Sequence, residues 1–298
     1  MNIKRVMVAG GGVLGSQIAM QTAYHGFDVV LYDINEESID SAKERMDKIT
    51  NRYREDLDAT DEKINEAYNR LSYSTDKGEA VKGVDLVIES IPEAIKIKTE
   101  FYEELGTLAD EHTIFATNTS TLLPSQFAEA TGRPEKFLAL HFANEIWKNN
   151  TAEIMKHDNT DMEIFEQIAE FSEDIGMVAL RLYKEQPGYI LNTLLVPLLN
   201  FGLALYTKQV ADIETIDKTW MIGTGAPKGP FAFLDIIGIT TAYNVIKTRA
   251  EETGDEGAEK LAAFLKKEYI DKNKLGVATG EGFYTYPNPR FEDPDFLT

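Results

Sequence analysis

The stretch Val6-Met-Val-Ala-Gly-Gly-Gly-Val-Leu-Gly15 decides how the first part of this chain folds. A short apolar run, typical of a buried strand, leads directly into the pattern Gly-x-Gly-x-x-Gly. Residues 16–24 continue with apolar side chains at helical spacing. Strand, glycine turn and helix in this order aim the helix N–H groups at a pyrophosphate. Glycine is required because a side chain would block the turn, the approach of the phosphates or the helix–strand packing. The stretch predicts a dinucleotide-binding unit of the Rossmann type.

A second apolar run, residues 28–32, ends in Asp33. An acid at this place hydrogen-bonds a ribose 2′-OH and repels a 2′-phosphate. A glycine motif alone is a weak signal, but the flanking strand, the helix and the acid together predict a site for NAD rather than NADP. The residues expected along the cofactor in this motif are Gly10, Gly12, Val13, Leu14, Gly15 and Asp33.

Length and composition limit the number of domains and the kinds of partner and site that this chain can have. Its 298 residues can hold two domains. The chain has no cysteine, which excludes disulfides, zinc thiolate sites and cysteine nucleophiles, and which fits a cytoplasmic location. The net charge of −20 argues against nucleic acid and anionic membranes as partners, since both need clustered basic side chains. The four histidines are scattered, so we expect no metal.

Strands and helices alternate through the first part of the sequence and stop alternating after residue 180. Residues 36–56 and 60–68 read as a helical hairpin inserted into the nucleotide fold. From Gln186 onward the pattern is helical, and Pro187-Gly188 reads as a break. The prediction is therefore an α/β protein with an N-terminal dinucleotide-binding domain, residues 1–184, and an all-α C-terminal domain, residues 185–298.

The longest apolar run, residues 189–206, reads as one helix. It contains Asn192, Pro197 and Asn200 and falls short of the ~20 apolar residues that a membrane span requires, so we expect no membrane partner. Such a helix is usually buried on all sides, which a small domain cannot easily achieve alone. We expect a homodimer interface here, the alternative being that the helix packs wholly within its own chain. Residues 251–259 and 287–298 are expected to be solvated loop and terminus.

His141 and Glu153 form the strongest catalytic candidate. Leu138-Ala-Leu-His141 is an apolar run that ends in a histidine, and Ala152-Glu-Ile-Met155 returns a carboxylate after a polar turn. If the two runs pair as strands, the carboxylate can accept one ring N–H and leave the other nitrogen to take a proton near neutral pH. A lone histidine at a strand end is more often structural. Here Asp33, residues 89–93, Ser120 and His141 all follow predicted strands, whose carboxyl ends meet at one crevice.

The motifs of this chain resemble those of the short-chain L-3-hydroxyacyl-CoA dehydrogenases, the β-oxidation and 3-hydroxybutyryl-CoA type. The resemblance spans nearly the whole length in family order. The motifs that carry it are GGGVLG at 10–15, Asp33, Glu93-Ala-Ile-Lys-Ile-Lys98, Asn118-Thr-Ser120, His141-Phe-x-Asn144, Glu153, Pro187-Gly-Tyr-Ile-Leu-Asn192, Gly229-Pro-Phe231 with Asp235, and Thr279-Gly-Glu-Gly-Phe283.

The resemblance implies an NAD domain, a helical dimerisation domain and an active site between them. It implies that His141 is the general base and that Glu153 orients it. Ser120 and Asn192 would contact the reacting oxygen of an acyl-CoA substrate. The remaining positions implied along the cofactor are Glu93, Lys98, Asn118, Ser120 and Asn144.

Several positions depart from the family pattern. Glu145 stands where the family has proline, and Trp147 follows in the same loop. Lys228 and Ala278 replace a methionine and a lysine. The two positions where family members contact CoA from the inserted helix are Ile49 and Asp56, with Arg52 and Arg54 as nearby substitutes or as ordinary surface charge.

Three functions therefore compete. The first is NAD-dependent oxidation or reduction at C3 of a short-chain 3-hydroxyacyl-CoA. The second is the same chemistry on a small free hydroxy acid, as in gulonate or carnitine dehydrogenases, with Lys148 or Lys228 pairing with its carboxylate. The third is a non-catalytic NAD-binding dimer, against which the set of His141, Glu153, Ser120 and Asn192 argues.

Overall fold

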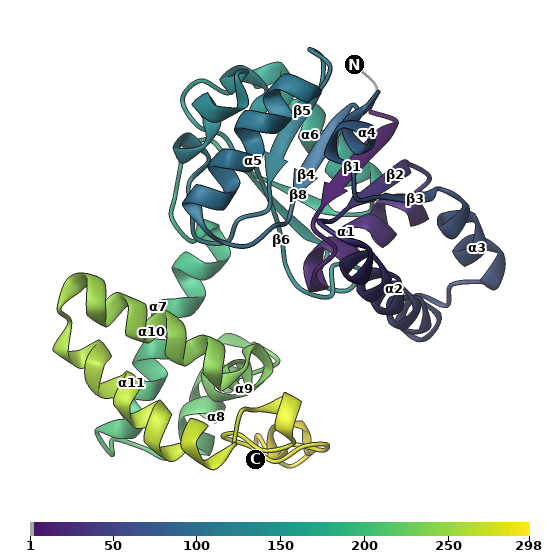
Figure 1. Cartoon of the computed structure of the whole chain (residues 1–298). Coiled ribbons are helices and arrows are strands. Elements are labelled where there is room, and N and C mark those ends of the chain that lie inside the picture. The colour runs from purple at the N-terminus through teal and green to yellow at the C-terminus, as the bar shows by residue number, and fades with distance from the viewer. Residues whose placement is uncertain (1–2) are drawn as a thin grey trace. The chain divides into compact units, whose positions relative to one another are not determined.

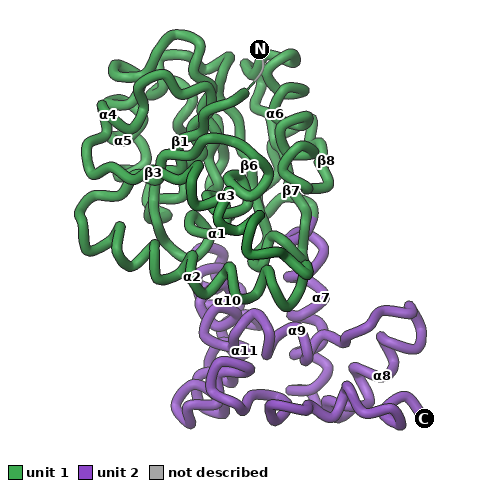
Figure 2. The backbone as a smooth tube through the Cα atoms, turned by 90° about the vertical axis from the view of Figure 1, so that its right-hand side faces the viewer, with its two compact units in different colours: residues 1–190 green, residues 191–298 purple. Residues whose placement is uncertain are grey.

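The computed structural model describes residues 3–298 and divides into two compact units (Figure 2). Unit 1 comprises residues 1–190 and unit 2 residues 191–298. The division falls after Ile190, later than the break predicted at residues 184–185. The reason is that the segment after Pro187 is still bonded to unit 1: the Tyr189 hydroxyl donates to the carbonyl of Thr119, and the N–H of Ile190 donates to Glu153.

Unit 1 is built on one eight-stranded sheet with the order β3-β2-β1-β4-β5-β6-β7-β8. The strands are β1 (Arg5–Ala9), β2 (Asp28–Tyr32), β3 (Leu71–Ser74), β4 (Leu86–Glu89), β5 (Ile114–Thr117), β6 (Phe137–Phe142), β7 (Thr151–Met155) and β8 (Val178–Leu182). Pairing is parallel throughout except between β6 and β7. The first six strands have the order of a dinucleotide-binding fold, which reverses between β1 and β4 and opens a crevice at their carboxyl ends.

Helices cover both faces of this sheet (Figure 1). They are α1 (Val13–Tyr24), α2 (Glu36–Leu57), α3 (Asp61–Asn69), α4 (Lys77–Val81), α5 (Ile95–Leu108) and α6 (Met162–Asp174), with short 3-10 turns at Pro124–Gln126, Ala128–Thr131 and Pro134–Lys136. The predicted helical hairpin is present as α2 and α3. Its two N-termini are capped by Asn35 and Thr60, whose side-chain oxygens accept backbone N–H groups.

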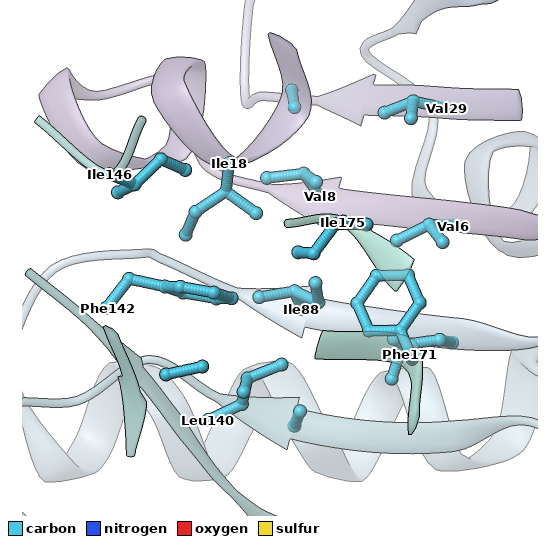
Figure 3. Close-up of a cluster of buried hydrophobic side chains, with 14 of the residues drawn as sticks. Val6, Val8, Ile18, Val29, Ile88, Leu140, Phe142, Ile146, Phe171 and Ile175 are labelled. Atoms are coloured by element: carbon cyan, nitrogen blue, oxygen red, sulfur yellow. The ribbon is translucent and has the colours of Figure 1, made fainter. Parts of the chain in front are cut away.

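The sheet is buried on both faces, which is why its strands read as unbroken apolar runs. Figure 3 shows one face, where side chains of β1, such as Val8, meet Ile18 of α1 and Phe171 of α6. On the other face Met7 and Ala9, also from β1, belong to the cluster that includes Phe101 and Tyr102 of α5. Packing from both sides holds the ends of the strands, and the loops that follow them, in fixed positions.

Unit 2 is helical, as predicted, and within residues 191–298 the structure has isolated β-bridges but no strand. Its helices are α7 (Tyr189–Thr207), α8 (Ile213–Thr224), α9 (Pro230–Ile237), α10 (Ile239–Thr253) and α11 (Glu256–Glu268), followed by 3-10 turns at Ile270–Lys272, Val277–Thr279 and Arg290–Glu292. Two buried carboxylates tie this unit together. Asp217 accepts the first N–H groups of α9, and Asp235 accepts the N–H groups of Phe283 and Tyr284.

Two sequence-based expectations for unit 2 were wrong. Residues 251–259 are not a loop, because α10 runs to Thr253 and α11 begins at Glu256, where Asp255 caps its N-terminus. The C-terminal segment is not simply a solvated terminus, since Phe291 and Phe296 are buried in the core of this unit. Residues 251–259 were predicted as a loop because they are rich in acidic residues. In the structure several of these acids cap helix α11 or lie in its first turn, where negative charge is favoured.

Helix α7 is largely uncovered. It is long and apolar enough to cross a membrane by length and composition, and 17% of its most apolar window is buried. Leu194 is 69% exposed and Phe201 is 72% exposed.

Candidate functional site

The glycine loop between β1 and α1 has the geometry that the motif predicts. Gly10 has φ +99°, and a Cβ built on it would lie 2.4 Å from the carbonyl oxygen of Ser90. A Cβ on Gly15 would lie 1.9 Å from the oxygen of Gly10. Helix α1 starts at Val13, immediately after Gly12. The free N–H groups of its first turn therefore face the end of β1, where an anionic phosphate is favoured.

A cleft of about 740 Å³ opens beside this loop, and its volume suits a nucleotide. Asp33 lies in it at the end of β2; its Oδ2 accepts the N–H of Gly11 at 2.7 Å and its Oδ1 accepts the N–H of Ile34 at 2.7 Å. Both carboxylate oxygens keep lone pairs for a ribose hydroxyl. The lining residues are Gly10, Gly12, Tyr32, Asp33, Ile34, Ser38, Lys77, Ser90, Ile91, Pro92, Ile97, Glu100, Phe101 and Glu104.

His141 and Glu153 meet as predicted. They are register partners in the antiparallel pair of β6 and β7, and His141 Nδ1 lies 3.1 Å from Glu153 Oε2. His141 is 7% exposed and Glu153 is 3% exposed. On the other side of the ring, His141 Nε2 lies 3.2 Å from the hydroxyl of Ser120. Carboxylate, imidazole and hydroxyl thus form one hydrogen-bonded chain that ends at an exposed serine.

Glu93 holds the loop that carries Ser120. Its Oε1 accepts the N–H groups of Ser120 and Thr121, each at 3.1 Å, and the hydroxyl groups of Thr119 and Thr121. Burial acts to raise the pKa of Glu93, but the hydrogen bond from Thr119 and the charge of Lys98 outweigh it and lower that pKa. The carboxylate is therefore ionised at neutral pH and organises the loop after β5.

Lys98 is more deeply buried than its expected place along a cofactor suggests. It is 1% exposed, and its Nζ lies 2.5 Å from Glu89 Oε1 and 3.2 Å from Glu93 Oε2. Neither Lys98 nor Glu93 lines the cleft described above. The structure thus places both residues under the Ser120 loop, where they support it.

The two asparagines predicted along the cofactor, Asn118 and Asn144, follow β5 and β6. The side chain of Asn118 accepts the N–H of Phe142 at 3.0 Å, which ties the two strand ends together. Asn144 accepts a hydrogen bond from Gln17 Nε2 at 3.1 Å, and Gln17 Oε1 accepts the N–H of Glu145 at 2.8 Å. Gln17, a residue that the sequence did not single out, thereby links the helix of the glycine loop to the segment after His141.

The remaining candidates lie at helix starts. Val13 and Leu14 are in the first turn of α1, next to the cleft. Asn192 is in the first turn of α7 and belongs to unit 2. No group of three or more histidine, aspartate or glutamate side chains is arranged to hold a metal ion anywhere in residues 3–298.

Three of the positions that depart from the family pattern, Asp56, Glu145 and Trp147, lie in one cluster. Asp56 of α2 accepts the indole N–H of Trp147 at 2.9 Å and pairs with Arg52 and Lys148, each at 3.2 Å. The hydrogen bond from Trp147, followed by the two cations, lowers the pKa of Asp56. Arg52 also lies 3.5 Å from Glu145, the residue that replaces the family's proline and has φ +56°.

The cations proposed as substitutes for CoA contacts are thus engaged with acids. Arg52 has the partners just described, and Arg54 pairs with Asp61 at 2.8 Å. Ile49, the other departing position of α2, is buried in the core.

Comparison with known proteins places this architecture in a family. The NAD binding domain of 3-hydroxyacyl-CoA dehydrogenase matches residues 5–186, and the C-terminal domain of 3-hydroxyacyl-CoA dehydrogenase matches residues 188–286. The mitochondrial hydroxyacyl-coenzyme A dehydrogenase of Homo sapiens is 36% identical over 289 residues, which cover 95% of this chain and 91% of the human protein.

Two solved structures share the fold over the same length. A diketoreductase, described for its substrate-directed dual catalysis of dicarbonyl compounds, is 52% identical with a TM-score of 0.92, and the match covers 96% of this chain and all of that one. The (S)-3-hydroxybutyryl-CoA dehydrogenase of Ralstonia eutropha is 26% identical with a TM-score of 0.84, at the same coverage.

Proposed function

The chain belongs to the NAD-dependent 3-hydroxyacyl-CoA dehydrogenase family, and on this premise we propose that it interconverts the C3 hydroxyl and the C3 ketone of a short-chain 3-hydroxyacyl-CoA. One observation carries the proposal. The hydrogen-bonded chain from Glu153 through His141 to Ser120 ends at an exposed hydroxyl among the strand ends of an NAD-binding sheet. A binding protein without catalysis has no use for such a chain.

His141 acts as the general base in the oxidation. Its Nδ1–H donates to Glu153, which leaves Nε2 unprotonated to accept the hydroxyl proton of the substrate. Bound NAD would supply the acceptor for the hydride that leaves C3. The carboxylate of Glu153 stabilises the imidazolium that forms, and in the reverse direction this imidazolium returns the proton to the ketone oxygen. Ser120, and Asn192 by family resemblance, hydrogen-bond the reacting oxygen and position it.

The cofactor is held by the features that line the cleft. The first turn of α1 and the glycine loop take the pyrophosphate, and Asp33 takes the ribose hydroxyls. Asn144, fixed by Gln17, is proposed to hold the nicotinamide next to His141.

A second candidate substrate is a dicarbonyl compound without CoA. The most specific support is the cluster around Asp56, because a CoA ester brings several negative charges and Arg52 and Lys148 are already paired with carboxylates. The 52% identity with a diketoreductase supports the same idea. A small free hydroxy acid is less well supported, since Lys148, one of the two cations considered for its carboxylate, is held by Asp56.

Initial rates of NADH oxidation separate these substrates. We would compare acetoacetyl-CoA, acetoacetate and an uncharged 1,3-diketone. The leading proposal expects the highest kcat/KM with the thioester, and a preference for the diketone by about tenfold or more would favour the second candidate. Asp56→Asn removes the negative charge that Arg52 and Lys148 share, so it should lower KM for the thioester alone. Asp47→Asn, on the same helix outside the cluster, is the matched control.

We further propose that the protein is a homodimer formed through unit 2. The exposed apolar face of α7, with Leu194 and Phe201, supports this. Phe201→Glu should convert the dimer to a monomer in sedimentation velocity, and an unchanged sedimentation coefficient would oppose the proposal. A place in β-oxidation and a cytoplasmic location remain predictions.

A further inference from the structure

Tyr189 contacts His141 of the proposed catalytic chain and the residue that precedes Ser120. Its ring stacks on the imidazole of His141, with ring centroids 4.4 Å apart and planes inclined by 17°. Its hydroxyl donates to the carbonyl oxygen of Thr119, the residue before Ser120, at 2.7 Å. Tyr189 is completely buried. One side chain thus contacts both the base and the loop that carries the serine.

The next residue, Ile190, contacts Glu153. The N–H of Ile190 donates to Glu153 Oε1 at 2.9 Å, while Oε2 of the same carboxylate faces His141. The two oxygens therefore have separate partners, and the carboxylate cannot rotate without breaking one of these contacts. The first two residues of α7 thus contact His141, Glu153 and the carbonyl group next to Ser120.

The backbone at this point is unusual. Tyr189 has φ +55° and follows Gly188, which has φ +79°. A bulky residue rarely adopts the left-handed region, and it persists there only when its surroundings hold it. The stacked ring and the hydrogen-bonded hydroxyl are among the contacts that hold it here, so this conformation is tied to the geometry of the site.

We propose that Tyr189 is a positioning residue that sets the orientation of the His141 ring and its distance to Ser120. This rests on the proposed function. The ring covers one face of the imidazole and so restricts its rotation about χ2, which keeps Nδ1 toward Glu153 and Nε2 toward the serine. The hydroxyl fixes the carbonyl that precedes Ser120, which sets where the serine stands.

Two variants separate these contributions. Tyr189→Phe keeps the stacked ring and removes only the hydroxyl, whereas Tyr189→Leu removes both. Phe165→Leu is the matched control, because Phe165 is an equally buried aromatic residue on α6 whose ring packs against Tyr183. We expect kcat to fall about 30-fold in Tyr189→Leu and about threefold in Tyr189→Phe, with KM for NADH changed less than about twofold. If Tyr189→Leu does not fold, Tyr189→Met takes its place.

The proposal is overturned if Tyr189→Leu keeps the kcat of Phe165→Leu, if Tyr189→Phe loses as much as Tyr189→Leu, or if the loss lies in KM for NADH. Imidazole ¹H–¹⁵N spectra give a second readout that needs no substrate, and the chain has only four histidines to assign. Wild type and Tyr189→Phe should show His141 in one tautomer, with the proton on Nδ1, and Tyr189→Leu a mixture. If His141 keeps the same single tautomer in Tyr189→Leu, the proposal is overturned. This result does not depend on knowing the substrate.

Discussion

Replacing Glu153 by glutamine removes one negative charge from the proposed catalytic chain and leaves its shape. The carboxylate oxygen lies 3.1 Å from His141 Nδ1, and both side chains are buried. At an effective dielectric constant of about 20, unit charges at this distance attract each other by about 5 kcal/mol. That energy is available only when the imidazole is protonated, which is the state formed during alcohol oxidation.

The glutamine amide also creates a conflict over hydrogen bonds. The two carboxylate oxygens accept from Ile190 N–H and from His141, but the amide has only one oxygen. If that oxygen serves Ile190, the NH₂ group faces Nδ1 and shifts the histidine proton to Nε2, the atom that must accept the substrate proton. If the amide is flipped, Ile190 faces an NH₂ group.

The Coulomb energy sets a ceiling of about four powers of ten on the loss, and the remaining amide dipole recovers part of it. We expect kcat to fall about 10²- to 10³-fold in Glu153→Gln, with KM for NADH within about twofold of wild type, because Glu153 does not line the cofactor cleft. Steady-state NADH oxidation measures both constants, and Glu153→Asp, which keeps the charge, should retain more activity. A Glu153→Gln enzyme with wild-type kcat would refute the role of the carboxylate.

Three further predictions concern the cofactor and stability. Asp33→Ala removes the acceptor of Gly11 N–H and of the ribose, so KM for NADH should rise about 10- to 100-fold and discrimination against NADPH should shrink; unchanged coenzyme preference would contradict this. Lys98→Met leaves the fully buried Glu89 without its cation and should cost about 3 kcal/mol in urea unfolding, whereas a loss below the error of that measurement would show that the pair is dispensable. Burial, followed by the charge of Lys63, lowers the pKa of His25, so the unfolded chain binds more protons below pH of about 6.5. Stability should therefore fall as the pH drops through that range, and His25→Gln should weaken this dependence in thermal unfolding at several pH values.

Features that depend on neighbouring residues could be predicted from the sequence. The glycine loop, the helical hairpin of α2 and α3, and the pairing of His141 with Glu153 all depend on short stretches whose pattern specifies a turn, a helix or a strand pair. The parallel sheet follows because its buried strands alternate with helices.

Features that depend on packing between distant segments could not be predicted. Gln17 bonds to Asn144 across 127 residues, and Trp147 bonds to Asp56 across 91. The sequence around a polar residue inside an apolar helix does not indicate which distant residue it will hydrogen-bond. Tyr189 lies in a recognised motif, but its role became visible only when the turn after Pro187 brought its ring against His141. Likewise, the sequence alone suggested Arg52 and Lys148 as cations available to a substrate, whereas in the structure both are paired with Asp56.

The proposed role of His141 as the acid and base is tested most directly by the turnover of His141→Gln. NADH oxidation would be followed with whichever substrate wild type reduces fastest, and NADH binding would be titrated by fluorescence in the same preparations. The structure predicts that kcat falls by about 10³-fold or more, because His141 links Glu153 to Ser120. The Kd for NADH should stay within about twofold, because the glycine loop and Asp33, which line the cofactor cleft, are unchanged in this variant. A His141→Gln enzyme that binds NADH and turns over at a rate near that of wild type would contradict it.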